Sequence, residues 1–209
     1  MSADVAVYDP IGIEPVEQAP PGRRHVLVVG ALLACAAGAA LLGAVLGDYL
    51  HARDLARDAG EPWVPDGTKL PNVALLVAYT GLLLSSFFAH WTLAAIKMDD
   101  RRQAYMATAF TVAMGLLFIN AMTFCWAQMG LGAGDSPYAT GMYAVTVTHV
   151  LMVIGAIATF VVVGFRVFAG RFDARDTEPV SAAVIIWHFT VLAGLVIWWT
   201  LWFVEGGPG

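Results

Sequence analysis

Five long stretches of this 209-residue chain are almost free of charged side chains. A helix of about 20 apolar residues crosses the hydrocarbon core of a bilayer, where every backbone N–H and C=O group must be paired within the segment. Charged residues make up 13% of the chain, against about one quarter in a soluble domain. The sequence therefore predicts an all-α membrane protein with five transmembrane helices in an antiparallel bundle, at about residues 26–50, 71–96, 104–130, 141–168 and 180–204.

The segments around these helices divide the chain into three parts. Residues 1–24 are acidic and rich in proline, and lack the basic start of a signal peptide, so they are predicted to form a disordered cytoplasmic tail. Residues 25–205 form the membrane domain, and residues 206–209 form a short outer tail. Because the loops are short, consecutive helices are expected to be neighbours.

Cationic residues are divided unevenly between the two ends of the predicted bundle. Cytoplasmic loops of membrane proteins carry an excess of Lys and Arg, so the N-terminus is expected in the cytoplasm and the C-terminus outside. Without an organelle-targeting sequence, the plasma membrane of a prokaryotic cell is favoured. The net charge of −5 does not indicate binding to nucleic acid. Eight of the 11 Lys and Arg residues belong to the N-terminal side, namely Arg23, Arg24, Lys97, Arg101, Arg102, Arg166, Arg171 and Arg175.

Two histidines fall at similar depths in different predicted helices. His90 lies about seven residues from the inner end of the second helix and His188 about eight from the inner end of the fifth, which places both at a depth of about 10 Å. They could face one another as axial ligands of a haem b. The favoured interpretation is that each imidazole hydrogen-bonds a neighbouring helix or a lipid headgroup. His149, in the outer half of the fourth helix, has no predicted partner at its own depth.

Small residues recur on the first predicted helix. Gly30, Ala34 and Gly38 are spaced four apart, and Gly43 and Gly47 follow. Such spacing lets another helix approach closely. The pattern predicts an interaction surface, with the ordinary abundance of Gly and Ala in apolar helices as the alternative. The two cysteines, in contrast, fall inside apolar stretches and suggest neither a disulfide nor a metal site.

A series of polar and aromatic residues recurs in order along the last four helices. Together, over about residues 41–205, the series resembles subunit III of the haem-copper respiratory oxidases, in a short five-helix form that lacks the first two helices of a seven-helix version. The matching residues are Pro71-Asn72, Ser85-Ser86 and Ala89-His90 in the second helix, Gly115-Leu116-Leu117-Phe118 in the third, Tyr138, Tyr143, Thr146, His149, Val153 and Gly155 in the fourth, and Trp187-His188-Phe189 in the fifth.

The resemblance implies a non-catalytic subunit of a terminal oxidase in aerobic respiration. Such a subunit would pack on and stabilise the haem-copper catalytic subunit, in a complex with a copper-binding subunit, and would hold membrane lipids. It would have no active site and bind no cofactor, because haem and copper would lie in the partner subunits. The candidates for subunit or lipid contacts are Gly38, Gly43, His90, His149, Trp187 and His188.

Three alternatives stay open at this point. They are a subunit III-like component of a nitric oxide reductase system, a haem b-binding membrane anchor that uses His90 and His188, and a small-molecule permease. The permease is the weakest, because charged residues are scarce within the predicted spans and transport cycles normally need them.

The resemblance is incomplete at four positions inside the predicted helices. The family pattern implies a membrane-buried glutamate where this chain has Gly38, and a glutamate late in the third helix where it has Cys125. A second histidine is replaced by Met152, and an aspartate after Trp-His-Phe by Val191. If such carboxylates bind lipid or deliver protons in the family, the same positions are not expected to do so in this chain.

Overall fold

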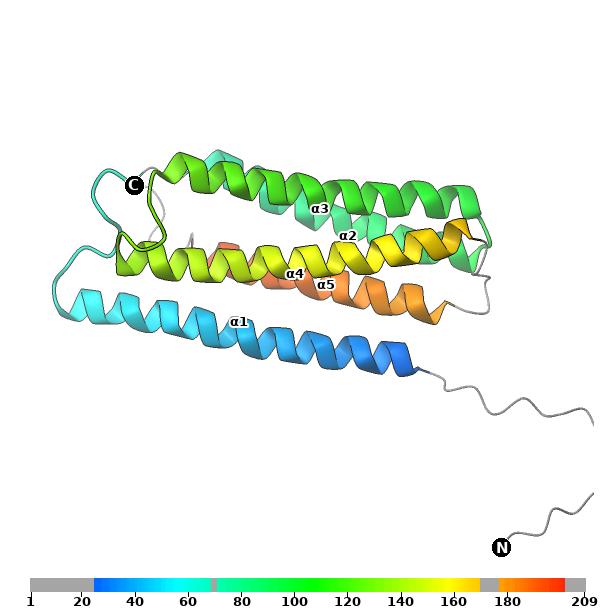
Figure 1. The fold of residues 1–209 in the computed structure, drawn as a ribbon, viewed down its shortest axis with the longest axis horizontal. Coiled ribbons are helices and arrows are strands. Elements are labelled where there is room, and N and C mark those ends of the chain that lie inside the picture. Colours follow the sequence, from blue (N-terminus) through cyan, green and yellow to red (C-terminus); the bar gives the residue numbers. More distant parts are fainter. Residues whose placement is uncertain (1–24, 69–70, 170–176, 202–209) are drawn as a thin grey trace, which may run out of the picture.

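The computed structural model describes residues 25–68, 71–169 and 177–201, and these residues form five helices that run along one axis (Figure 1). Each helix is long and apolar enough to cross a membrane, and no strand occurs within the described ranges. The predicted all-α fold with five spans is confirmed. The proposed tails, 1–24 and 206–209, lie outside the described residues. The helices are α1 (Val26–Asp58), α2 (Asn72–Lys97), α3 (Arg101–Met129), α4 (Pro137–Phe168) and α5 (Glu178–Trp199).

The first helix is longer than the sequence predicted. It was expected to end near residue 50, where charged residues begin, but it continues through 33 residues to Asp58. At 1.5 Å per residue this is about 50 Å, well beyond a hydrocarbon core of about 30 Å. Charged side chains end a membrane span but do not end a helix, and Arg53 and Asp54 form an ion pair within the extension at 3.2 Å.

Two helices begin earlier than predicted because of side-chain caps. Ser136 accepts a hydrogen bond from the Ala139 N–H, and Pro137 occupies the first turn of α4. Asp100 accepts one from the Gln103 N–H at the start of α3. This backbone hydrogen bond holds the pKa of the Asp100 carboxyl below its usual value.

The helices pack as a four-helix group with α1 added on one side. Helix α2 contacts α3 and α5, and α4 contacts α3 and α5, whereas α1 contacts α4 and α5 (Figure 1). The expectation that consecutive helices are neighbours is therefore wrong for α1 and α2, which do not touch among the described residues. The connection between them carries the chain across the end of the bundle.

Helix α1 is joined to the rest of the bundle by different contacts at its two ends. We call the end that holds the start of α1 and the start of α5 the inner end, and the opposite one the outer end. At the inner end the carboxylate of Glu178 accepts hydrogen bonds from the backbone N–H groups of Leu27 at 2.7 Å and Val28 at 3.4 Å. An acidic side chain at a helix N-terminus satisfies unpaired donors and complements the helix dipole.

At the outer end an aromatic cluster joins α1, its following loop and α4. Trp63 meets the rings of Tyr49 and Tyr138 edge-on, with centroids 5.4 and 5.7 Å apart, and its Nε1–H donates to the Tyr49 hydroxyl at 3.2 Å. Gly141 lies so close to Tyr49 that an added Cβ would be 2.8 Å from the ring. Trp63 thus packs within the chain at this end of the bundle.

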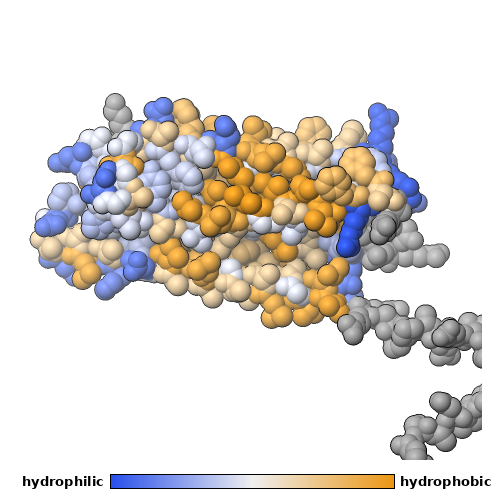
Figure 2. Space-filling model, in the orientation of Figure 1, coloured by the Kyte–Doolittle hydropathy of each residue, from blue (hydrophilic) through white to orange (hydrophobic). Residues whose placement is uncertain are grey.

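Much of the exterior is apolar. Figure 2 shows strongly hydrophilic residues gathered toward the two ends and a continuous hydrophobic area over α4 and the adjoining part of α3. Large apolar side chains such as Leu117, Val162 and Phe165 are 60%, 54% and 70% exposed. A surface of this kind is stable in lipid, which agrees with five membrane-spanning helices.

Candidate functional site

The two serines of α2 meet the Trp-His pair of α5. The Nε1–H of Trp187 donates a hydrogen bond to Ser85 Oγ at 2.9 Å, and both residues are buried. Ser85 in turn donates to the backbone carbonyl of Leu82 in its own helix. Two motifs that lie about 100 positions apart in the sequence therefore form one buried polar contact between helices.

A glycine of α3 makes room for the indole of Trp187. A Cβ added to Gly115 would lie 2.8 Å from Trp187 Cη2 and 2.9 Å from the side chain of Ile157. The indole also meets Phe160 of α4 edge-on, with centroids 5.1 Å apart. Trp187 therefore stands at the point where α2, α3, α4 and α5 come together.

His188 and His90 lie side by side, as their predicted depths suggested. Their ring centroids are 6.2 Å apart, and His188 Nδ1 lies 3.1 Å from Ser86 Oγ. His90 is exposed on the surface of the bundle and His188 is partly buried. At this level α2 and α5 are joined by the Trp187–Ser85 and His188–Ser86 contacts.

His149 is fully buried and has a partner that the sequence did not predict. Its Nε2 lies 2.9 Å from the backbone carbonyl of Thr190 in α5, which makes Nε2–H the donor. The imidazole stacks on Tyr79 with centroids 6.1 Å apart. Gly194, one turn beyond Thr190, leaves space for it, because an added Cβ would lie 2.7 Å from the imidazole Cε1. The partner of His149 is thus a backbone carbonyl of α5 and not a second histidine.

The two histidines should differ in their effect on stability. His149→Ala removes a buried hydrogen bond and leaves a cavity, so we expect a loss of about 2–4 kcal/mol. His188→Ala removes a partly exposed contact between membrane helices, which is worth about 0.5–1.5 kcal/mol. Thermal unfolding of the purified variants in one detergent should rank them in this order. A larger loss for His188→Ala would contradict the assignment, and so would loss of a haem band from a purified complex of either variant.

Two positions that depart from the family pattern lie next to each other in the structure. A Cβ added to Gly38 would lie 3.0 Å from Phe189 Cε1 and 3.7 Å from Met152 Cε. The resemblance implied a glutamate at the first position and a histidine at Met152. Apolar atoms of Met152 and Phe189 lie beside Gly38, so the two positions meet where α1, α4 and α5 come together.

The predicted interaction surface on α1 divides into two parts. Gly38 faces this chain's own Phe189, so its close contact lies within the chain. Gly30, Gly43 and Gly47 have no atom within 4 Å of an added Cβ, and Gly43 is exposed. The open part of the surface is therefore the one that a partner helix could approach.

Within the described ranges, no group of three or more His, Cys, Asp and Glu residues could hold a metal ion. Cys125 is buried on α3 and Cys35 is partly buried on α1. Of the polar residues that the sequence singled out, Trp187 and His188 lie within hydrogen-bond distance of serines of α2, and His149 binds a backbone carbonyl of α5.

Several contributors to these contacts were missed from the sequence. The Thr190 carbonyl belongs to the backbone, so no residue type marks it. Gly194 looks like an ordinary glycine of an apolar helix until the ring beside it is known, and Gly115 was singled out by the family pattern without the reason, which is its contact with Trp187. Glu178 carried a stronger signal, because an acidic residue at a predicted helix start commonly satisfies backbone donors, in this case those of another helix.

Comparison with known proteins places the chain in a family. Residues 24–205 match the family model described as cytochrome c oxidase subunit III. The cytochrome c oxidase subunit 3 of Thermostichus vulcanus is 28% identical over 84% of this chain and 86% of that protein. The proteins of that name from Synechocystis and Strongylocentrotus purpuratus are 26% and 27% identical, and the aligned parts cover 75% and 56% of those proteins. The chain belongs to the cytochrome c oxidase subunit III family.

Proposed function

We propose that this chain is the non-catalytic subunit III of a haem-copper terminal oxidase, where it packs on the catalytic subunit and stabilises it. The observation that carries this proposal is that the motif residues make contacts between the helices of this chain. Trp187 and His149 are buried and bonded to neighbouring helices, and His188 is beside Ser86, so their polar atoms hold the bundle together. Electron transfer and oxygen reduction would then take place in the partner subunits, which carry the haem and copper.

The exposed face of α1 is the proposed docking surface for the catalytic subunit. Only Ala31, Leu42 and Tyr49 of this helix are buried, and the open glycines Gly43 and Gly47 let another helix come close. In lipid such contacts are stabilised by van der Waals packing, since the acyl tails are already apolar. A copper-binding subunit would belong to the same complex.

The orientation of the chain in the membrane is proposed from the distribution of Lys and Arg residues, and the kind of complex from the family. We place the N-terminus in the cytoplasm of a prokaryotic cell and the C-terminus outside, because the Lys and Arg residues are concentrated at the inner end. Lipids would fill the apolar exterior around the bundle. A place in a nitric oxide reductase system is the second candidate from the sequence, and the names of the related proteins do not favour it.

Co-purification tests the proposed function. A chain with an affinity tag, expressed in its own host and extracted in a mild detergent, should retain a haem-copper catalytic subunit in about equal amount. Mass spectrometry identifies the retained subunits, and an unrelated tagged membrane protein from the same host serves as the control. Retention of nitric oxide reductase subunits in place of an oxidase would favour the second candidate, and retention of neither would contradict both.

A further inference from the structure

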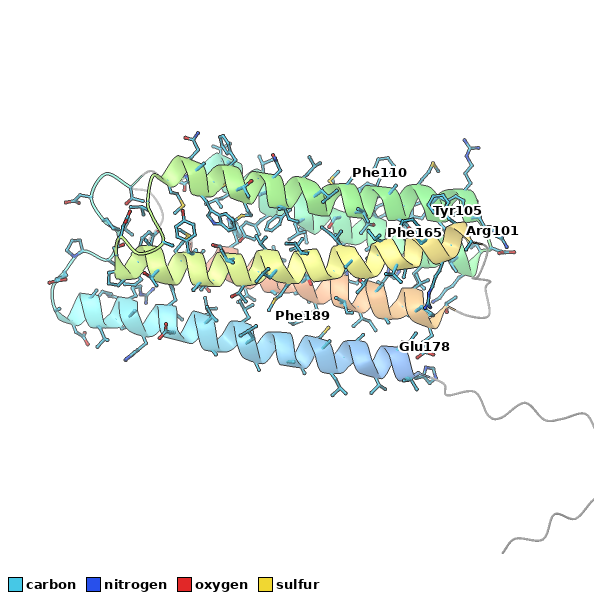
Figure 3. The ribbon with its side chains drawn as sticks, in the orientation of Figure 1. Arg101, Tyr105, Phe110, Phe165, Glu178 and Phe189 are labelled. Atoms are coloured by element: carbon cyan, nitrogen blue, oxygen red, sulfur yellow. The ribbon has the colours of Figure 1, made fainter. Side chains whose placement is uncertain are left out.

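An internal cavity lies in the outer half of the four-helix group formed by α2, α3, α4 and α5. It extends inward from Asn72, Met129 and Tyr138, which stand near the outer ends of their helices, to Tyr79. Figure 3 shows side chains in the space between α3 and α4 in that half of the bundle. The cavity has a volume of about 40 Å³ and is partly enclosed. None of the described residues that line it carries a charge, so its chemistry suits a neutral ligand.

The hydroxyl of Tyr79 is the polar group at the deep end of the cavity. Tyr79 is 4% exposed, and its ring stacks on His149 and meets Phe118 edge-on, with centroids 5.3 Å apart in the second contact. Aromatic side chains of a helix lean toward its N-terminus. For α2 this is the outer end, so the hydroxyl points into the cavity that Tyr79 lines. Among the described residues this buried hydroxyl has no hydrogen-bond partner.

A second unpaired polar atom lies nearer the outer end. Asn72 Oδ1 is buried and has no hydrogen-bond partner in the described part of the chain, and Asn72 lines the same cavity. Asn72 precedes Tyr79 by seven residues, or two helical turns, so both lie on one face of α2, about 10 Å apart along the axis. The wall also holds the Thr146 hydroxyl, which accepts from the Trp126 Nε1–H at 3.1 Å. A donor and an acceptor are therefore left unpaired along one narrow cavity.

We propose that this cavity is a binding site for ordered water, which enters from the outer end and bridges the Tyr79 hydroxyl to Asn72 Oδ1. Water is neutral, accepts from a phenol and donates to an amide oxygen, so it pairs both atoms. A buried water needs roughly 10–15 Å³ and two to four polar partners, so the cavity has room for about three. A hydrocarbon tail in the same space would leave both polar atoms unpaired. The bound water holds the Tyr79 ring in place against His149.

The test measures contact between water and the methionine side chains of the cavity. The full-length chain is deuterated, isotopically labelled in the methyl groups of its methionines, and placed in nanodiscs of ordinary phosphatidylcholine. Met122, Met129 and Met142 line the cavity, whereas Met152 lies beside Gly38 and serves as the control. We expect NMR cross-peaks between water and the cavity methionines, and none between water and Met152. An absence of water cross-peaks from every cavity methionine would overturn the proposal, and so would cross-peaks with lipid acyl protons in their place.

Matched variants on α2 test the site itself. Leu75→Phe puts a ring into the cavity and should abolish the water cross-peaks, whereas Leu76→Phe, at a neighbouring position that is 48% exposed, should keep them. Tyr79→Phe removes the hydroxyl and no carbon atom. It should weaken the cross-peaks and lower the unfolding temperature by about 2–4 °C, because the water loses a partner.

Two results with these variants would contradict a hydrated cavity. One is a set of water cross-peaks that Leu75→Phe leaves unchanged. The other is a higher unfolding temperature for Tyr79→Phe, because the removal of a hydroxyl from a dry cavity relieves an unpaired buried group. If Leu75→Phe does not fold, Tyr79→Phe decides the question, since it preserves the packing of the ring against His149 and Phe118.

Discussion

Replacing Gly194 with leucine is expected to prevent stable folding of the five-helix bundle. A Cβ at this position would lie 2.7 Å from His149 Cε1 and 3.3 Å from Tyr79 Cε1, before the rest of the leucine is added. The imidazole would have to leave its site and give up the hydrogen bond to the Thr190 carbonyl. Overpacking costs about 1–3 kcal/mol and a buried unsatisfied group adds about 1–3 kcal/mol, a large part of the stability of a typical domain.

The measurement is the yield and monodispersity of the purified chain, followed by its unfolding temperature. Gly155→Leu is the matched control, because it places the same side chain on the neighbouring α4 where no atom lies within 4 Å of an added Cβ. We expect Gly155→Leu to purify like the wild type and Gly194→Leu to be lost or aggregated. Equal behaviour of the two variants would show that His149 does not occupy the position described.

Replacing Gly43 with leucine is expected to release the catalytic subunit while leaving this chain folded. Gly43 is exposed and has no neighbour within 4 Å of an added Cβ, so a leucine there meets nothing in this chain but would push a docked helix away. We expect co-purification of the catalytic subunit to fall about tenfold, which corresponds to about 1.4 kcal/mol. The unfolding temperature of the isolated chain should stay the same.

Two further glycine variants serve as comparisons for Gly43→Leu. Gly81→Leu adds the same side chain on α2, where nothing lies within 4 Å, and should leave co-purification intact. In Gly38→Leu the new side chain would clash with Phe189 of α5. This variant should therefore lower both the unfolding temperature of the isolated chain and its retention of partners. Normal co-purification by Gly43→Leu would mean that this face of α1 is turned toward bulk lipid.

The sequence predicted the helices well because apolar length is a property of each segment alone. It also placed His90 and His188 at one depth, since a fixed rise per residue turns sequence position into depth. Rotation about the helix axes and the choice of neighbours depend on packing between segments. For that reason the separation of α1 from α2, the Thr190 partner of His149 and the contact of Gly38 with Phe189 could not be foreseen.

Helix ends were less predictable for a related reason. Charge marks where a segment leaves the membrane, and α1 continues for about two helical turns past that point. The starts of α3 and α4 are set by the caps of Asp100 and Ser136, whose side chains accept from backbone N–H groups of the first turn. The paired departures at Gly38 and Met152 became meaningful only once α1 and α4 were seen in contact.

The most direct test of a non-catalytic subunit is the visible absorbance of the purified chain and of its complex. The isolated chain should show no Soret or α band, because His188 lies against Ser86 and His149 against Thr190 within the bundle. The complex purified through the same chain should show the bands of a haem-copper oxidase. A stoichiometric b-type spectrum with two histidine ligands from the isolated chain, lost on His90→Ala, would contradict the proposed function and establish a haem-binding anchor.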